Sequence, residues 1–417
     1  MQYDLVVIGL GYVGLPLARE AGLTGLRVAG LDRNPSVVTS LGAGRSHVDD
    51  VSDGQVTQML AGGFTPTADT VVLGDAEAVA ICVPTPLAAD GRPDLTAVVD
   101  SARAIAARLR PGMLVVLEST TYPGTTDEVL RPVLEESGLR AGVDFHLAFS
   151  PERIDPGNAE FGMRNTPKVI GGHTPACADA AMALYGKLCD QLVRAKGTRE
   201  AEMAKLLENT YRHVNIALVN EMVAFCHELG VDLWDSIACA SSKPFGYEPF
   251  YPGPGAGGHC IPIDPNYLSY KVRSLGYPFR FVELAQEINA RMPAYVVTRA
   301  MELLNRHGRA LRGARVALLG VTYKQDVADQ RESPALAVAT ELLRRGAVLS
   351  YHDPYVRQWQ VDGRPIPRLA DLETAIGDTD LLVLLQAHRD YVNGALTDAD
   401  PMLDTRGVIR GAGVEAL

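Results

Sequence analysis

The feature that most constrains the fold of this chain is the glycine-rich segment Gly9–Gly14, with the sequence Gly-Leu-Gly-Tyr-Val-Gly. It directly follows the apolar run Leu5–Ile8 and opens a segment that can be helical. Asp32 lies 23 residues after Gly9, at the end of the next apolar run, Arg27–Leu31. This G-x-G-x-x-G pattern between a strand and a helix, with an acidic residue at that distance, is typical of a dinucleotide-binding βαβ unit.

The chemistry of this segment indicates the cofactor. The glycines let backbone N–H groups and the positive end of the helix approach a pyrophosphate. Asp32 is expected to accept hydrogen bonds from the adenosine ribose and to repel a 2′-phosphate, which favours NAD over NADP. The alternative interpretation is a tight turn with an aspartate on the surface.

The rest of the chain predicts an α/β fold. The apolar runs Ala78–Val83 and Met113–Leu117 each end in a Pro- or Gly-bearing turn, as expected for a parallel sheet with helical crossovers. The last segment repeats the first, because Arg315–Gly320 is again an apolar run ending in glycine, and Val348–Tyr351 is soon followed by Asp353. We therefore expect two doubly wound Rossmann-like domains joined by a long central helical segment.

The predicted boundaries are residues 1–198 for the first Rossmann-like domain, which would bind NAD, 199–308 for the central helical domain, and 309–417 for the second Rossmann-like domain. Apolar residues in the central segment recur at helical spacing. They are Met203, Leu207, Val214, Leu218, Met222 and Phe225. A second helix is expected over 281–307, with a kink or break at Pro293. The Pro/Gly-rich loop 243–265 lies between these helices, and loops of this length are usually functional.

Composition narrows the class of protein. The net charge is −11 and no basic block occurs, so nucleic acid is not an expected partner. No apolar run reaches the roughly 18 residues that span a bilayer, and the N-terminus reads as a strand, not a signal peptide. The six cysteines are dispersed without C-x-x-C spacing, so we expect no metal site and a reducing cytoplasm.

Three positions in the sequence are candidates for catalytic residues. Cys260 follows Gly257, Gly258 and His259 in the long loop, and it is either a nucleophile or a small buried hydrophobe. Lys205 and Asn209 are spaced i, i+4 and share one helix face, which is either functional or merely solvated. Glu152 follows the apolar run 145–149, and a carboxylate at a strand end is a candidate acid or base.

Several separate blocks, occurring in the right order, together resemble the UDP-glucose/GDP-mannose dehydrogenase family over essentially the whole chain. These blocks are 7–16, 83–86, 118–120, 150–153, 205–209, 257–260 with Asp264, 323–324 and 331–334. The resemblance implies that NAD oxidises the C6 alcohol of a nucleotide sugar to a carboxylate in two hydride transfers. Cys260 would hold the sugar as a thiohemiacetal and then as a thioester. The long central helix would form a dimer interface.

The resemblance also implies residue roles. The residues expected to bind NAD are Gly9, Gly11, Tyr12, Val13, Gly14, Asp32, Val83, Pro84, Thr85, Ser119, Thr120 and Arg331. The residues expected to be catalytic are Cys260, Lys205, Asn209, Asp264, Glu152 and Thr120. The residues expected to bind the substrate are Glu152, Arg153, Lys205, Asn209, Tyr251, Gly257 and Lys324. Among these, Lys324 would contact the diphosphate and Arg331 would reach the cofactor.

The loop around Cys260 resembles the branch that oxidises UDP-N-acetylhexosamines. In the UDP-glucose branch the loop usually reads Phe-Gly-Gly-Ser-Cys, whereas here His259 stands in the serine position. UDP-glucose and a dTDP-sugar stay open as substrates. Two other functions also stay open: a two-electron β-hydroxyacid-type dehydrogenase, and a non-catalytic NAD-binding sensor.

Overall fold

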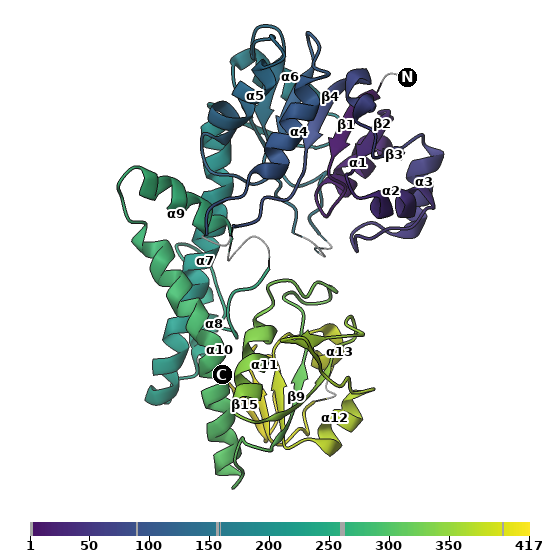
Figure 1. Ribbon diagram of the computed structural model, residues 1–417. Helices are drawn as coiled ribbons and strands as arrows, with labels where there is room; N and C mark the ends of the chain where they lie inside the picture. Colours follow the sequence, from purple (N-terminus) through teal and green to yellow (C-terminus); the bar gives the residue numbers. More distant parts are fainter. Residues whose placement is uncertain (1–2, 89–90, 156–157, 159, 259–262, 394–395) are drawn as a thin grey trace. The chain divides into compact units, whose positions relative to one another are not determined.

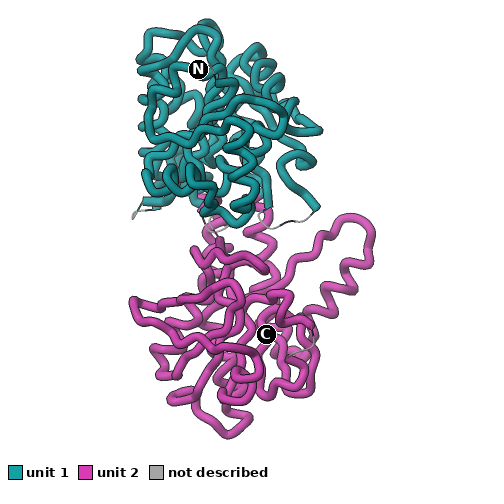
Figure 2. The backbone as a smooth tube through the Cα atoms, turned by 90° about the vertical axis from the view of Figure 1, so that its right-hand side faces the viewer, with its two compact units in different colours: residues 1–208, 266–277 teal, residues 209–265, 278–417 magenta. Residues whose placement is uncertain are grey.

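The computed structural model describes residues 3–88, 91–155, 158, 160–258, 263–393 and 396–417. The chain divides into two compact units, shown in different colours in Figure 2. Unit 1 comprises Met1–Glu208 and Asn266–Tyr277, and unit 2 comprises Asn209–Pro265 and Pro278–Leu417. Cys260 and His259 lie outside the described residues.

Unit 1 is built on an eight-stranded sheet in the order β3-β2-β1-β4-β5-β6-β7-β8. Its strands are β1 (Tyr3–Ile8), β2 (Val28–Leu31), β3 (Thr65–Thr67), β4 (Ala76–Ile81), β5 (Leu114–Leu117), β6 (His146–Phe149), β7 (Lys168–Gly172) and β8 (Leu192–Arg194). All neighbouring strands are parallel except β6 and β7. The first six follow the Rossmann order 3-2-1-4-5-6, which places the topological switch between β1 and β4.

Helices cover both faces of this sheet (Figure 1). They are α1 (Gly14–Leu23), α2 (Pro35–Gly42), α3 (Asp53–Ala61), α4 (Thr96–Ala106), α5 (Arg131–Glu135) and α6 (Pro175–Tyr185), with a 3₁₀ turn η1 (Thr70–Asp75) and a π turn η2 (Thr126–Leu130). Alternate residues of β1 enter different cores, because Leu5 and Val7 belong to one cluster and Val6 and Ile8 to the other. A strand buried on both faces reads as a continuous apolar run, as this one does.

Unit 2 contains a second doubly wound sheet, entirely parallel, in the order β10-β9-β13-β14-β15. Its strands are β9 (Arg315–Leu319), β10 (Val348–His352), β13 (Leu381–Leu384), β14 (Met402–Asp404) and β15 (Val414–Ala416), and β11 (Gln360–Val361) pairs with β12 (Arg364–Pro365). The helices around it are α11 (Pro334–Arg344), α12 (Leu372–Asp378) and α13 (Arg389–Val392). The predicted α/β class with two doubly wound domains is confirmed.

The central segment is helical, as predicted. It contains α7 (Thr198–Leu229), α8 (Leu233–Ser241), α9 (Asp264–Ser274) and α10 (Arg280–Arg306). Of the kink or break predicted at Pro293, the break does not occur, because α10 continues through that residue, and the kink stays a prediction. Pro293 lacks the N–H that would bond the carbonyl of Asn289, and the loop at Gly255 packs beside that carbonyl. Within the described part of the chain, no helix is both long and apolar enough to cross a membrane.

Candidate active site

The three fingerprint glycines meet three different steric demands. Gly9 has φ +88°, and a Cβ there would lie 2.7 Å from the carbonyl oxygen of Cys82. A Cβ on Gly14 would lie 1.8 Å from the carbonyl oxygen of Gly9, so α1 packs against the turn only with glycine. A Cβ on Gly11 would meet nothing within 4 Å. This open space is what a pyrophosphate needs in order to approach the backbone.

Asp32 is held in place by the backbone around it. The N–H of Leu10 donates to its Oδ2 at 2.9 Å, and the N–H of Asn34 donates to its Oδ1 at 2.9 Å. The side chain is half-buried, so lone pairs of both oxygens stay available to a ribose diol. Together with the space above Gly11, this arrangement fits NAD. Tyr12 and Val13 are also half-buried and pack against the core beneath the turn.

We predict that the enzyme prefers NAD over NADP and that Asp32→Ala erodes this preference. Loss of charge-assisted hydrogen bonds to the ribose should lower kcat/KM for NAD by roughly 10- to 100-fold, corresponding to about 1.5–3 kcal/mol. The measurement is kcat/KM with each cofactor, with Arg33→Ala, the adjacent exposed position, as a control. Equal values for NAD and NADP in the unaltered protein would contradict this role of Asp32.

The turns after β4 and β5, predicted to line the nicotinamide side, are hydrogen-bonded to each other. Thr85 Oγ1 donates to the carbonyl oxygen of Thr120 at 2.8 Å. Ser119 Oγ lies 2.7 Å from the carbonyl oxygen of Val83. Pro84 is exposed beside them. The structure therefore brings together two turns whose bonded residues are 35 and 36 positions apart in sequence.

Glu152 lies after β6 beside a buried ion cluster that sequence patterns did not reveal. Lys168 Nζ lies 2.6 Å from Glu118 Oε2 and 4.0 Å from Glu152 Oε2. Tyr185 donates its hydroxyl to the other oxygen of Glu118. Burial raises the pKa of Glu118, while for Lys168 burial pulls the pKa down and the two carboxylates outweigh it, so the pKa is raised. The only hint in the sequence is a lysine opening an otherwise apolar strand.

Backbone hydrogen bonds hold only one of the two oxygens of the Glu152 carboxylate. Its Oε1 accepts hydrogen bonds from the N–H groups of Arg153 and Ile154. Its Oε2 is buried without a hydrogen bond among the described residues. Arg153 lies 2.7 Å from Glu208 on α7, so this turn is tied to the helix that carries Lys205 and Asn209.

Two of the predicted catalytic residues meet although they are 55 residues apart in sequence. Asn209 on α7 donates its side-chain amide to Oδ2 of Asp264, the first residue of α9. Asp264 is buried at 4 % exposure. Lys205, one turn earlier on α7, is half-buried, and no described residue bonds its ammonium.

The loop that leads to Cys260 packs tightly within unit 2. A Cβ on Gly257 would lie 2.8 Å from the carbonyl oxygen of Glu332, and a Cβ on Gly258 would lie 2.8 Å from the ring of Tyr323. Earlier in the loop, the N–H of Gly253 donates to Asn220 Oδ1 at 2.9 Å. The loop therefore requires its glycines. Tyr251 is exposed, with about half of its surface accessible (52 %).

At the switch point of unit 2, an aspartate again accepts the backbone N–H that follows a glycine turn, but here the aspartate is buried. Val321 N–H donates to Asp353 Oδ2 at 2.7 Å, as Leu10 N–H does to Asp32. Asp353, however, is fully buried and lies 3.2 Å from His388 Nε2. Since Nδ1 of His388 accepts from the N–H of Asp326, Nε2 is the donor to Asp353. This acid is therefore enclosed by protein groups and is not exposed to a ribose as Asp32 is.

Lys324 follows this same turn, and its carbonyl accepts a hydrogen bond from Thr322 Oγ1 at 2.8 Å. Arg331 holds Asp329 through Nε at 2.8 Å and Nη2 at 2.5 Å, and its own side chain is about half exposed. Ligands of doubly wound sheets bind at such switch points. A contact between Arg331 and the cofactor stays a prediction.

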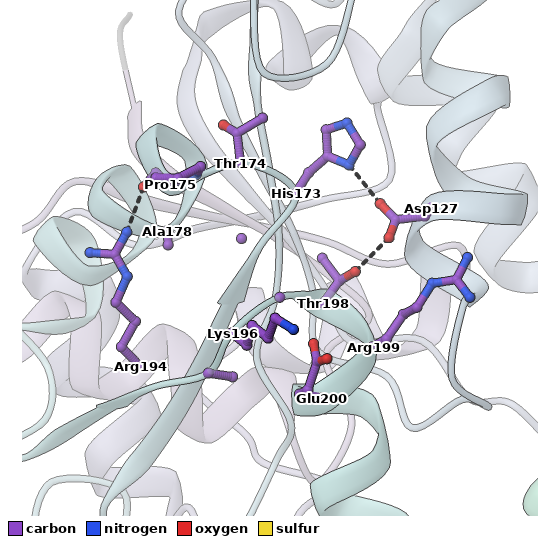
Figure 3. A pocket seen from close by; sticks show the side chains of 13 residues that line it. Asp127, His173, Thr174, Pro175, Ala178, Arg194, Lys196, Thr198, Arg199 and Glu200 are labelled. Carbon is purple, nitrogen blue, oxygen red and sulfur yellow. Dashed lines mark hydrogen bonds and ion pairs between the residues drawn. The ribbon is translucent and has the colours of Figure 1, made fainter.

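A surface cavity of about 410 Å³ in unit 1 lies elsewhere (Figure 3). It is bordered by the first residues of α6 and α7. None of the residues predicted to bind NAD or substrate lines it.

Comparison with known proteins decides the family. Residues 3–189 match the NAD binding domain of the UDP-glucose/GDP-mannose dehydrogenase family, residues 199–291 its central domain, and residues 317–411 its UDP binding domain. The chain belongs to this family. It is therefore an NAD-dependent nucleotide-sugar dehydrogenase, and NAD is its cofactor.

Individual relatives are similar over most of their length. The UDP-N-acetyl-D-mannosamine dehydrogenase of Salmonella typhi is 35% identical over 97% of this chain and 98% of its own. The UDP-N-acetyl-D-glucosamine 6-dehydrogenase of Pseudomonas aeruginosa is 36% identical over 84% of this chain and 83% of its own. A solved structure of UDP-D-ManNAc dehydrogenase from Pyrococcus horikoshii has TM-score 0.89 and 32% identity, covering 99% of this chain and 98% of that one.

Proposed function

We propose that this family member oxidises C6 of a UDP-N-acetylhexosamine to the uronic acid, with Cys260 as covalent nucleophile. The observation that carries the catalytic part is the hydrogen bond between Asn209 and Asp264, because it joins helix α7 to the residue four positions after Cys260. The names of the relatives and the His259-Cys260 loop favour an N-acetylhexosamine over glucose.

The reaction removes four electrons from C6. NAD, when bound, accepts one hydride from this carbon in each of two oxidations. The alcohol first becomes an aldehyde, and the Cys260 thiolate then adds to it as a thiohemiacetal. The second oxidation leaves a thioester, and water releases the carboxylate and regenerates the thiol. The covalent bond keeps the aldehyde in the site between the two oxidations.

The residues on α7 would handle protons and developing charge. Asp264 fixes the amide of Asn209, whose second N–H stays available to an oxyanion. The ammonium of Lys205, a half-buried residue, is a second donor, and one such donor typically contributes about 3 kcal/mol to transition-state stabilisation. Glu152, whose Oε2 lies 4.0 Å from Lys168 Nζ and has no hydrogen bond among the described residues, would assist the attack of water on the thioester.

The experiment that tests this function measures NADH and product mass with UDP-N-acetylmannosamine, UDP-N-acetylglucosamine, UDP-glucose, dTDP-glucose and GDP-mannose. We expect two NADH per sugar and a uronic acid from an N-acetylhexosamine. One NADH per sugar would instead support the two-electron alternative. No NADH with any sugar would support a non-catalytic NAD-binding protein.

We predict that Lys324→Ala raises KM for the sugar nucleotide far more than KM for NAD. A lysine that binds a diphosphate makes charge-assisted hydrogen bonds, so the increase should be roughly 10- to 100-fold. Lys243→Ala is the control, because Lys243 is exposed and its ammonium contacts the ring of Phe245. A larger effect on KM for NAD would place Lys324 in the cofactor site.

We also propose a homodimer or larger homo-oligomer formed through α7. Large apolar side chains of this helix are exposed. They are Met203, Leu207, Tyr211, Leu218, Phe225 and Leu229. Of the predicted apolar stripe, Val214 and Met222 are half-buried.

Sedimentation at micromolar concentration should therefore show a dimer or larger species. Leu218→Glu with Phe225→Glu should shift it to monomer, because burying two unpaired carboxylates opposes association. The control variant Val348→Glu, at an exposed apolar position outside α7, should not change the oligomeric state. A monomeric unaltered protein would refute the oligomer and leave the catalytic proposal intact.

We retain two further proposals. The first is the division at residues 198 and 308, which the spans of the three family domains support. The second is a cytoplasmic location. It is supported by the five described cysteines, all of which are free thiols.

A further inference from the structure

A buried carboxylate on α7 binds the loop that follows β5. Glu202 Oε2 accepts the N–H of Gly124 at 2.5 Å, and its Oε1 accepts the N–H and the hydroxyl of Thr126 at 2.8 Å and 2.7 Å. These donors lie 76 and 78 residues before Glu202 in sequence. One side chain therefore joins two distant segments of unit 1.

Burial of the Glu202 carboxylate costs free energy, because a charged group is removed from water. The residue is fully buried, and its three hydrogen bonds come from neutral donors. Burial raises the pKa of Glu202 to about 7, and the hydrogen bonds from Thr126 and Gly124 lower it only in part. A desolvated carboxylate is costly unless its acceptors are satisfied, and strongly shifted carboxylates cluster at functional sites.

The segment that Glu202 binds is held to α7 at two more points. Asp127 accepts a hydrogen bond from the hydroxyl of Thr198, the first residue of α7, at 2.7 Å, and lies 2.7 Å from His173 Nδ1 (Figure 3). Glu128 pairs with Arg199 at 2.9 Å on the surface. Residues 124–128 thus form a docking segment against the first two turns of α7. It includes the start of the π turn η2, and π turns are frequent near functional sites.

The two segments joined by Glu202 both lead to proposed catalytic residues. Thr120 lies four residues before Gly124 in the same loop. Lys205 lies three residues after Glu202 on α7, so the two side chains project from the same side of the helix. The position of Thr120 relative to Lys205 therefore depends on the contact between Glu202 and the docking segment.

We propose that Glu202 is a positioning residue for the dehydrogenase reaction: its carboxylate locks the loop carrying Thr120 to the helix carrying Lys205. The inference rests on the proposed roles of Thr120 and Lys205. It does not require Glu202 to touch the substrate or the cofactor.

The test is Glu202→Gln, which keeps the shape of the side chain but replaces one acceptor oxygen with an NH₂ group. This group faces either the N–H of Gly124 or the two donors of Thr126. We expect kcat to fall between roughly 10- and 100-fold, as for other small displacements of reacting groups. KM for the sugar nucleotide and Kd for NAD should change less than about threefold, because the fingerprint and Lys324 are remote from Glu202 in sequence and make no described contact with it. Glu128→Gln is the matched control, because it makes the same chemical change in the same segment. The ion pairs of Glu128 with Arg199 and Lys271 involve a partly exposed carboxylate and contribute little, so kcat should stay within about twofold.

Thr126→Val removes one hydrogen bond from the loop side and keeps the test valid if Glu202→Gln folds poorly. We expect a smaller fall in kcat, and the double variant should be no slower than Glu202→Gln alone. Thermal denaturation reports the folded fraction of each variant. A kcat within twofold of the unaltered enzyme, or one that falls only with the folded fraction, would overturn the proposal. The kcat values of Thr120→Ala and Lys205→Ala are measured in parallel. If both stay near that of the unaltered enzyme, the catalytic roles are wrong; if both fall while Glu202→Gln does not, only the positioning role of Glu202 is wrong.

Discussion

Replacing Cys260 with alanine should abolish nearly all net turnover, by roughly a thousandfold or more, while binding of NAD and of the sugar nucleotide persists. A free aldehyde at C6 has no alkoxide to expel a hydride until a nucleophile adds to it. The thiolate supplies this addition and later leaves readily, whereas serine is a poorer nucleophile and a poorer leaving group. Cys260→Ser should therefore be very slow, or stall as an ester adduct visible by intact mass.

The other cysteines are the controls for this prediction. Cys239 is exposed, and Cys82, Cys177, Cys189 and Cys226 are buried. Alanine at Cys239 should leave the rate unchanged, and alanine at the buried positions should lower stability at most. If Cys260→Ala still formed carboxylate with two NADH per sugar at a near-normal rate, the covalent route would be wrong. A hydrated aldehyde, with Lys205 or Asp264 activating water, would then replace the thioester.

Replacing Lys168 with methionine should destabilise unit 1 by about 3–5 kcal/mol. Removal of the ammonium leaves Glu118 fully buried beside Glu152, and no other described residue forms an ion pair with Glu118 or Glu152. Methionine fills a similar volume, so the loss reports charge and not packing. The measurement is the midpoint of thermal unfolding, combined with hydrogen exchange of β5 and β7, which reports unit 1 separately.

A second substitution tests the cause of this loss. Adding Glu118→Gln to Lys168→Met removes one of the two uncompensated charges and should recover part of the stability, because a neutral amide is cheaper to bury than a carboxylate. Arg164→Met is the control, since Arg164 forms an ion pair with Asp190 in which both side chains are more than half exposed. A loss at Lys168 no larger than the loss at Arg164 would show that the buried cluster contributes nothing to stability.

Local sequence patterns were sufficient for the fold class and the NAD fingerprint. Gly9 and Gly14 are required by a positive φ angle and by a backbone contact, both of which arise within one turn. Asp32 directly follows the neighbouring strand β2, so its position follows from the alternation of strand and helix. The catalytic set around Cys260 came from resemblance to the family, since its local sequence left a nucleophile and a buried thiol equally open.

A comparison of the two switch points shows what local sequence patterns do not predict, which is the burial and the partners of the aspartate. Asp32 and Asp353 stand at the same place in the strand order, and each accepts the N–H that follows a glycine turn. Only tertiary packing places His388 beside Asp353 and buries both, while Asp32 stays half-open. The same local pattern therefore gives a half-exposed aspartate in unit 1 and a buried aspartate bonded to a histidine in unit 2.

Lys168 and Glu202 illustrate the same limit for single charged residues. Each stands in a segment whose own pattern predicts only a strand or a helix. Lys168 meets Glu118, 50 residues away, and Glu202 meets Gly124, 78 residues away. Periodicity describes neighbours within about four positions along a helix, or two along a strand, because those are the residues that share a face. Which buried charge meets which partner is decided when the sheet and the helices pack, since only then are both groups removed from water and forced to satisfy each other.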